Sequence, residues 1–258
     1  MPPKVIVVIP LYQATLKDDE LRALANNLAC LAEFPAVFLK PKGLDLTALL
    51  SQFPHVDEME VSPNWLGTAR GLAGYNEMMM SADFYDRFAH YDYLLICHVD
   101  AWVFRNELVE WMSKGYDHVA APWPKRTPYR HFPLKQIRAL RLWLKPRMKI
   151  IRWQRFGHIG NGGFSLRKVE SFRCACLKYA DEIAYFKAQE NELYNEDLFW
   201  AFVPKELHVP TVEEALKFAF DVQPAFCYAD ADHRLPMACH GFNKPDRIGF
   251  WQQFIPEL

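Results

Sequence analysis

Two side chains able to share a metal ion follow a strongly apolar segment. The segment DYLLIC, residues 92–97, is typical of a buried strand, and His98, Val99 and Asp100 come directly after it. Residues one apart on an extended chain project to the same side, so His98 and Asp100 can face one ligand. This pair suits Mn²⁺, or Mg²⁺ held mainly through the carboxylate. The structural alternative makes Asp100 the cap of the next turn and His98 a core residue.

An acidic pair and a late histidine are the next candidates. Glu196 and Asp197 stand at an apparent helix start, where either is a candidate base for deprotonating an acceptor hydroxyl. Acidic residues in a first helical turn are also favoured by the helix dipole alone. His240, between Cys239 and Gly241, is either a further metal ligand or a structural histidine.

The glycine-rich segment at 160–163 (GNGG) allows a ligand to approach the backbone closely. It is not a phosphate-binding lysine loop, because no Gly-Lys-Ser/Thr follows it. It is not a dinucleotide fingerprint either, because no clear strand precedes it.

Alternating strands and helices are expected to position these residues. Residues 4–9 (KVIVVI) and 36–39 are strand-like, and residues 18–33 between them have the apolar spacing of an amphipathic helix. Further strands are expected at 56–61, 92–97 and 118–121, and further helices at 44–53, 68–81, 106–114, 168–179, 196–202 and 212–220. This order favours an α/β fold with a mostly parallel sheet and helices on both faces, whose catalytic groups lie at the carboxyl ends of strands.

Length and composition fit one soluble domain over residues 1–258. Hydrophobic residues make up 51% of the chain, and no repeat or low-complexity linker marks a boundary. No apolar run reaches the roughly 20 residues that span a bilayer. The first residues lack a signal-peptide pattern, and the six cysteines lack the spacing of a zinc site or redox dithiol. We therefore expect a cytoplasmic protein with reduced thiols.

Basic residues are concentrated in one segment. Between His118 and Val169 there are 13 Lys or Arg and no acidic residue, whereas the remainder carries 17 basic and 31 acidic residues. An insert at about 124–156 contains an amphipathic basic helix, whose apolar and aromatic residues are Leu134, Ile137, Leu140, Trp143 and Leu144, with Trp153 beyond it. This pattern is typical of a helix lying on an anionic membrane, so we expect residues 134–155 to contact one. The alternative is a solvated helix that packs on the sheet or gathers a polyanionic acceptor. No nucleic-acid partner is expected, because no binding motif accompanies the charge.

Seven segments in order carry a resemblance to a known family: VVIPLY, GYNEMMMSADFY, YDYLLICHVDAWVF, GYDHVAAPW, GNGGFSLR, NEDLFW and CHGF. Together they resemble GT-A fold glycosyltransferases, and most closely a bacterial family of little-studied glycosyltransferase-like proteins. The resemblance covers most of the chain outside the basic insert.

The resemblance implies a donor site. Pro10, Leu11 and Tyr12 would line the nucleotide base pocket, and Tyr75 and Asn76 would lie near the nucleoside. Asp100 would stand where the family's metal-binding Asp-x-Asp motif ends, and would hold the donor diphosphate through Mn²⁺ or Mg²⁺. His98 takes the place of the first aspartate, which departs from the family pattern.

The resemblance also implies the acceptor side. Asn161, Gly162 and Gly163 would shape the sugar and acceptor site. Glu196 and Asp197 would be the acidic pair whose aspartate is the base in inverting enzymes. His240 would complete the metal site.

The expected function is therefore transfer of a sugar from a nucleotide-sugar, by resemblance a UDP-sugar, to a glycan or lipid-diphosphate-linked acceptor. Transfer would invert the anomeric configuration and serve surface polysaccharide synthesis, with the protein peripheral at the inner face of the membrane. One alternative is a nucleotidyltransferase, although IPLYQATLKDD lacks the usual N-terminal phosphate loop. The other is a non-catalytic carbohydrate-binding protein on the same fold, which the histidine at position 98 keeps open.

Overall fold

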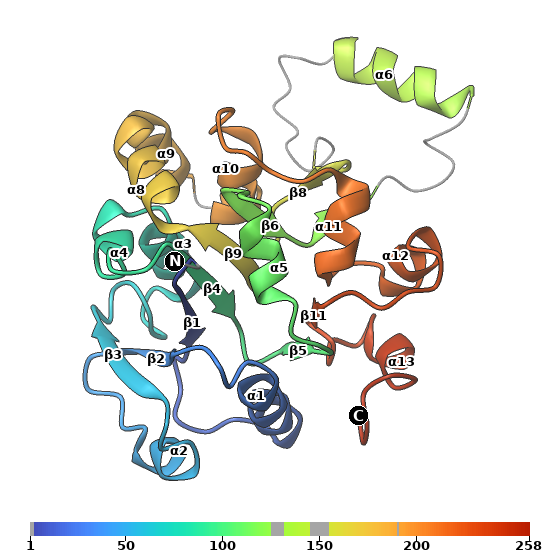
Figure 1. Ribbon diagram of the computed structural model, residues 1–258. Coiled ribbons are helices and arrows are strands. Elements are labelled where there is room, and N and C mark those ends of the chain that lie inside the picture. The colour runs from blue at the N-terminus through green and yellow to red at the C-terminus, as the bar shows by residue number, and fades with distance from the viewer. Residues whose placement is uncertain (1–2, 125–131, 145–154, 190) are drawn as a thin grey trace.

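The computed structural model describes residues 3–124, 132–144, 155–189 and 191–258. Its centre is a six-stranded sheet with the order β3-β2-β1-β4-β9-β6 (Figure 1). The strands are β1 (Val5–Pro10), β2 (Ala36–Pro41), β3 (Asp57–Val61), β4 (Tyr93–Cys97), β6 (His118–Ala120) and β9 (Phe164–Lys168). The first four run parallel, and β9 runs antiparallel to both β4 and β6. The expected mostly parallel, mixed α/β sheet is confirmed.

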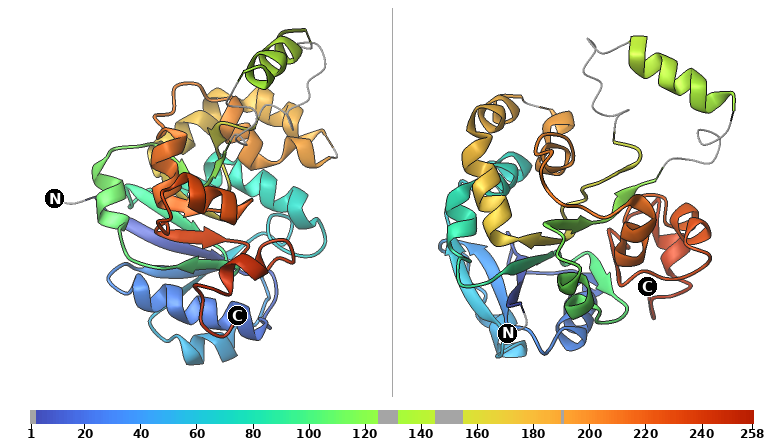
Figure 2. Two further views of the ribbon diagram at one scale, coloured as in Figure 1. Left: turned by 90° about the vertical axis from the view of Figure 1, so that its right-hand side faces the viewer. Right: turned by 45° about the horizontal axis from the view of Figure 1, so that its top comes forward.

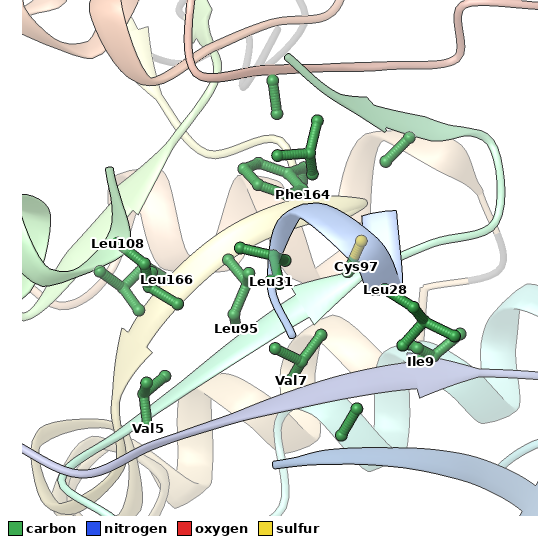
Figure 3. Packing of buried hydrophobic residues seen from close by; sticks show 14 of the residues in the cluster. Val5, Val7, Ile9, Leu28, Leu31, Leu95, Cys97, Leu108, Phe164 and Leu166 are labelled. Carbon is green, nitrogen blue, oxygen red and sulfur yellow. The ribbon is translucent and has the colours of Figure 1, made fainter. Parts of the chain in front are cut away.

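Helices cover both faces of this sheet because its strands are apolar on both sides. In β1, Val5, Val7 and Ile9 enter one core, whereas Ile6 and Val8 enter the other. The first core, part of which Figure 3 shows, includes residues of α1 (Asp18–Cys30), α2 (Thr47–Gln52), α5 (Leu108–Ser113) and α11 (Val212–Phe218). The second includes residues of α3 (Gly71–Met79), α4 (Ala82–Asp86), α8 (Val169–Lys178), α9 (Ala180–Lys187) and α10 (Glu196–Phe202).

Two small sheets extend the carboxyl edge of the main one. The first has the order β10-β11-β5, with β10 (Ala219–Phe220), β11 (Ala238–His240) and β5 (Ala101–Val103). The second pairs β7 (Pro122–Trp123) with β8 (His158–Ile159). A third apolar cluster joins the first small sheet to α13 (Ile248–Trp251) and α12 (Pro224–Asp230). The remaining elements are α6 (Leu134–Leu144) and the short 3₁₀ helix η2 (Glu192–Tyr194).

Some expected element boundaries are wrong. The expected helix 212–220 ends at Phe218, because Ala219 and Phe220 are extended and pair with β11. The expected helix 68–81 is shorter, since Gly71 has a φ of +48° at its start and a separate helix, α4, follows Ser81. The glycine-rich segment enters a strand, β9, before α8 begins.

The expected basic insert is described only in part. Helix α6 forms where the periodicity predicts it, and it projects away from the sheet (Figures 1 and 2). Residues 125–131 and 145–154, which include Trp153, lie outside the described residues. In the part of the chain that the structure describes, no helix combines the length and the apolar character that crossing a bilayer requires.

A buried amide connects α1 to β5. The Asn27 side chain donates to the Ala101 carbonyl and accepts from the Val103 amide, both at 2.8 Å. Asn27 is 3% exposed, so these backbone groups have no access to water. The side chain thereby holds β5, and the residues that precede it, against α1.

We expect Asn27→Ala to lower the free energy of unfolding by about 2–4 kcal/mol, because it leaves two buried backbone groups unpaired. Urea unfolding followed by circular dichroism measures the change. Asn26→Ala is the comparison variant, since the half-buried Asn26 Nδ2 donates to the Val103 carbonyl at 2.8 Å and to Asn27 Oδ1 at 3.3 Å. Its loss should be about 1 kcal/mol, because Asn27 keeps both of its own bonds to β5 in that variant. Equal losses in the two variants would contradict the role given to Asn27.

Candidate active site

Three residues singled out in the sequence meet at the carboxyl edge of the sheet. His98 follows β4, Asp100 precedes β5, and His240 ends β11. The antiparallel pairing of β11 with β5 sets His240 opposite Ala101, and so beside Asp100. One ligand atom from each of the three side chains lies within 4.8 Å of the others. The Asp100 Oδ1 to His240 Nε2 distance is 3.0 Å.

The protonation states of this trio are set by burial and by charge. Burial and the neighbouring His240 lower the pKa of His98 to about 4, so that its imidazole is neutral. Burial lowers the pKa of His240, but the Asp100 and Asp221 carboxylates outweigh it and raise that pKa to about 9. Burial likewise opposes ionisation of Asp100, yet His240 holds its pKa below the usual value. In the absence of a metal, His240 is thus a cation between two carboxylates.

The ligand atoms of these three side chains are of the types that bind a divalent metal ion. Two imidazoles and a carboxylate are a donor set for Mn²⁺ and its transition-metal neighbours, whereas Mg²⁺ favours oxygen ligands. The buried His240 Nδ1 lies 3.3 Å from Asp221 Oδ1 without an aligned hydrogen bond. A carboxylate beside the non-coordinating nitrogen of a histidine is the usual support for a metal ligand. These residues can therefore hold a divalent metal.

Residues that the sequence analysis missed surround His240. Asp221 is 4% exposed and pairs with Arg247 and with the Asn161 side chain. Lys244 Nζ lies 3.8 Å from Asp100 Oδ2 and remains 44% exposed in its side chain. Asp221 follows a strand end, as His98 does, but the expected helix through Phe220 concealed that strand. Lys244, four residues after His240, has no comparable sequence signal.

The glycine-rich segment, residues 160–163, passes between two groups of side chains. One is the candidate metal-binding set of His98, Asp100 and His240, called the metal trio below, and the other is the acidic pair of Glu196 and Asp197. A Cβ on Gly163 would lie 2.1 Å from His240 Nε2, and a Cβ on Gly162 would lie 2.1 Å from Glu196 Oε1. Both approaches are too close for any side chain. The side-chain Oδ1 of Asn161 accepts from the Gly163 amide at 3.0 Å, and the Gly163 backbone carbonyl accepts from the His98 amide at 2.9 Å. Glycine is required here because the Glu196 carboxylate and the His240 imidazole lie directly against the backbone.

The two acidic residues have different surroundings. The Glu196 carboxylate is buried and contacts Arg167 Nη2 through both oxygens, at 3.1 and 3.3 Å. Asp197 is only partly buried, and its Oδ1 accepts from the Leu198 amide at 2.8 Å. Burial, together with the charge of Glu196, raises the pKa of Asp197 to about 7. A pKa near neutrality suits a general base, whereas the Glu196 carboxylate is engaged in an ion pair with Arg167.

Helix α3 borders the site through Tyr75 and Asn76. The Tyr75 hydroxyl lies 2.9 Å from His98 Nε2 and fixes the imidazole. Asn76 donates to Asn195 Oδ1 at 3.1 Å and accepts from the Glu196 amide at 3.2 Å. One turn of α3 is thus connected both to the metal trio and to the start of α10.

The expected base-pocket residues lie at the end of β1. The register of β1 with β4 sets Val8 opposite Ile96, so the end of β1 is level with His98. Pro10 and Leu11 are buried there, and Tyr12 follows with 54% of its surface exposed. Tyr12 is available to a ligand at the same edge of the sheet.

Solved structures share this fold at low sequence identity. The apo structure of the bifunctional glycosyltransferase WbbM aligns with a TM-score of 0.55 and 13% identity, over 93% of this chain and 46% of that one. The present chain thus spans less than half the length of WbbM. The galactosyltransferase LgtC, in complex with donor and acceptor sugar analogs, aligns with a TM-score of 0.53 and 14% identity, over 91% and 86% of the two chains. Mouse xyloside xylosyltransferase 1 aligns with a TM-score of 0.50 and 11% identity, over 93% and 97%.

Comparison with curated proteins gives no match. A family comparison matches residues 57–240 to the family described as "Protein of unknown function (DUF5672)". The matched residues include the whole metal trio, the glycine-rich segment and the acidic pair. The fold is the GT-A fold of glycosyltransferases, and the chain belongs to the DUF5672 family.

Proposed function

We propose that this protein is a metal-dependent glycosyltransferase that moves a sugar from a nucleotide-sugar, in our proposal a UDP-sugar, to an acceptor hydroxyl. The observation that carries the proposal is the trio of His98, Asp100 and His240 at the carboxyl edge of a GT-A sheet. The solved LgtC structure, which has this fold, contains donor and acceptor sugar analogs. Ligand sites in open α/β sheets lie at this edge.

The metal trio and Lys244 form the proposed diphosphate end of the site. His98, Asp100 and His240 would hold Mn²⁺ in preference to Mg²⁺, and the ion would stabilise the charge of the leaving diphosphate. The exposed ammonium of Lys244 lies beside Asp100 and would bind a diphosphate oxygen. Tyr12, Tyr75 and the end of β1 would border the nucleoside.

Asp197 is the proposed general base. The glycine-rich segment runs from His240 to Glu196, so a sugar lying along it has the metal trio at one end and the acidic pair at the other. The Asp197 carboxylate would take the proton of the acceptor hydroxyl while that oxygen bonds to the anomeric carbon and the bond to the diphosphate breaks. Such a single displacement inverts the anomeric configuration. Glu196, held by Arg167, would position Asp197.

The proposed acceptor is a glycan on a lipid diphosphate, reached at an anionic membrane during surface polysaccharide synthesis. Helix α6 supports this part, because Leu134, Ile137 and Leu140 are 40%, 41% and 54% exposed. The surrounding basic segment matches the charge of anionic headgroups. A helix that is both apolar and basic, and that projects from the domain, is suited to the surface of such a bilayer (Figure 2).

Nucleotide binding tests the donor site. We expect calorimetry with UDP, GDP and dTDP to show tight binding of one nucleotide, in our proposal UDP, that requires Mn²⁺. Asp100→Ala should weaken this binding at least about tenfold, because it removes the carboxylate ligand. Asp57→Ala is the control, since Asp57 is an exposed carboxylate on the distant edge strand. Absence of nucleotide binding under every condition would contradict the proposal and favour a non-catalytic protein.

Asp197→Asn should lower the transfer rate by about 100-fold to 10,000-fold and leave nucleotide affinity unchanged. In the wild type, the rate should rise with pH through about 7, because only the ionised carboxylate accepts a proton. Release of UDP from a UDP-sugar measures the rate, and proton NMR of the product gives the anomeric configuration. Asp181→Asn, in the first turn of α9, is the matched control. If Asp197→Asn retained the wild-type rate, Asp197 would be excluded as the base. If the wild-type protein released pyrophosphate instead of UDP, the activity would be nucleotidyl transfer.

Vesicle flotation tests the membrane surface. With phosphatidylserine-containing vesicles, the protein should float at low salt and less so at high salt. Ile137→Glu should weaken binding by about tenfold or more, because it places a charge in the apolar contact. Val109→Glu is the control, since Val109 is also apolar and 51% exposed but lies on α5. Failure to float at low salt would contradict the proposed membrane contact, but not the proposed donor site or the proposed base.

A further inference from the structure

A cavity of about 170 Å³ lies beside the candidate active site, between α3, α9 and the segment that leads into α10. Its walls include Ala73 and Asn76 from α3, Phe186 from α9, and Gln189, Tyr194 and Asn195 from the segment that follows. This volume equals that of about five or six water molecules. It matches one sugar ring and is too small for an oligosaccharide.

The lining has the chemistry of a site for hydroxyl groups. Four residues with carboxamide side chains line this small cavity: Asn76, Gln189, Asn191 and Asn195. Each already makes a hydrogen bond within the protein, but those bonds use at most one of the two amide N–H groups of each side chain. A carboxamide both donates and accepts hydrogen bonds, as a sugar hydroxyl does. Phe186 and Tyr194, whose ring centroids are 5.2 Å apart, supply an aromatic wall for the apolar face of a pyranose.

The charges around the cavity are already paired among themselves. Arg70 and Lys187 both line it, but Arg70 Nη1 lies 2.7 Å from one Glu77 oxygen and Lys187 Nζ lies 3.0 Å from the other. One carboxylate therefore offsets much of the basic charge. This balance favours an uncharged sugar over a phosphate or a uronic acid.

The cavity is built from the same contacts that hold the active site. Asn76 lines the cavity, and the preceding residue, Tyr75, which lies about 100° further round α3, contacts His98. Asn195 lines the cavity as well, and its hydrogen bond to Asn76 ties α3 to the start of α10. Two residues later comes Asp197, the proposed base. The acidic pair does not line the cavity but directly follows its wall residue Asn195, so a sugar in the cavity would lie on the acceptor side of the site.

We infer that this cavity is a subsite for one uncharged pyranose unit of the acceptor glycan. The inference rests on the proposed function, because it is that function which makes the ligand an acceptor. The subsite would anchor one acceptor sugar while a neighbouring unit presents its hydroxyl to Asp197.

Saturation-transfer NMR with the full chain tests the subsite, using the methyl pyranosides of glucose, galactose, mannose and N-acetylglucosamine as probes. At least one probe should bind, and Ala73→Phe should raise its Kd about tenfold or more because the new ring fills the cavity. Ala48→Phe is the matched control, since Ala48 is an exposed helical alanine on α2. Gln189→Ala should also weaken binding, whereas Gln253→Ala should not, although each glutamine bonds a nearby backbone carbonyl.

The outcomes separate this inference from the proposed function. Binding of no pyranoside, or binding that Ala73→Phe leaves unchanged, overturns the subsite even if UDP and Mn²⁺ bind as expected. Pyranoside binding that Ala73→Phe abolishes supports the subsite. If a pyranoside binds in the cavity but no nucleotide binds, the proposed glycosyl transfer is contradicted. The cavity is then the ligand site of a sugar-binding protein. In the Ala73→Phe variant itself, nucleotide affinity should stay at the wild-type value.

Discussion

The arrangement of the site depends on one buried ion pair, between Arg167 of β9 and Glu196 of α10. Arg167 is fully buried, and its guanidinium also contacts the Tyr85 hydroxyl at 3.0 Å and the Ser165 hydroxyl at 3.1 Å. An arginine buried without a carboxylate would be strongly destabilising, so α10 must begin where Glu196 reaches β9. Asp197 is thereby fixed against the glycine-rich segment, and the nearby charge of Glu196 contributes to its raised pKa.

The second constraint is the meeting of strand ends from two sheets. The main sheet brings the end of β4 to this edge, where the residue opposite His98 is Gly163, which has no side chain to offer a ligand. The small sheet supplies one by pairing β11 antiparallel to β5, which turns His240 back toward Asp100. Asn27 secures β5 from the helix side. The polar centre therefore lies at a junction that neither sheet forms alone.

The predictable part of this protein is the part with strong local patterns. Continuous apolar runs such as residues 4–9 and 92–97 identify the parallel strands, because strands buried on both faces carry no polar alternation. His98 and Asp100 follow from their place after such a strand, and the GT-A fold follows from ordered motifs. Strands of two or three residues, such as β10, have too little pattern to be separated from a preceding helix, and this concealed Asp221. The Arg167–Glu196 pair spans 29 residues of sequence, and nothing local in either residue indicates its partner.

The shortness of the second sheet ties the order of the C-terminal region to what the site holds. Strand β11 has three residues and pairs with β5 through only three register positions, so its hold on β5 depends on the burial of its side chains as well as on backbone hydrogen bonds. Any ligand that bridges Asp100 and His240 adds its binding free energy to the cost of pulling β11 away from β5. Separation of β11 from β5 and release of such a ligand are therefore thermodynamically linked. The resistance of β11 and its neighbours to proteolysis therefore reports how much of the Asp100–His240 site is occupied by a ligand, without any measurement of enzymatic turnover.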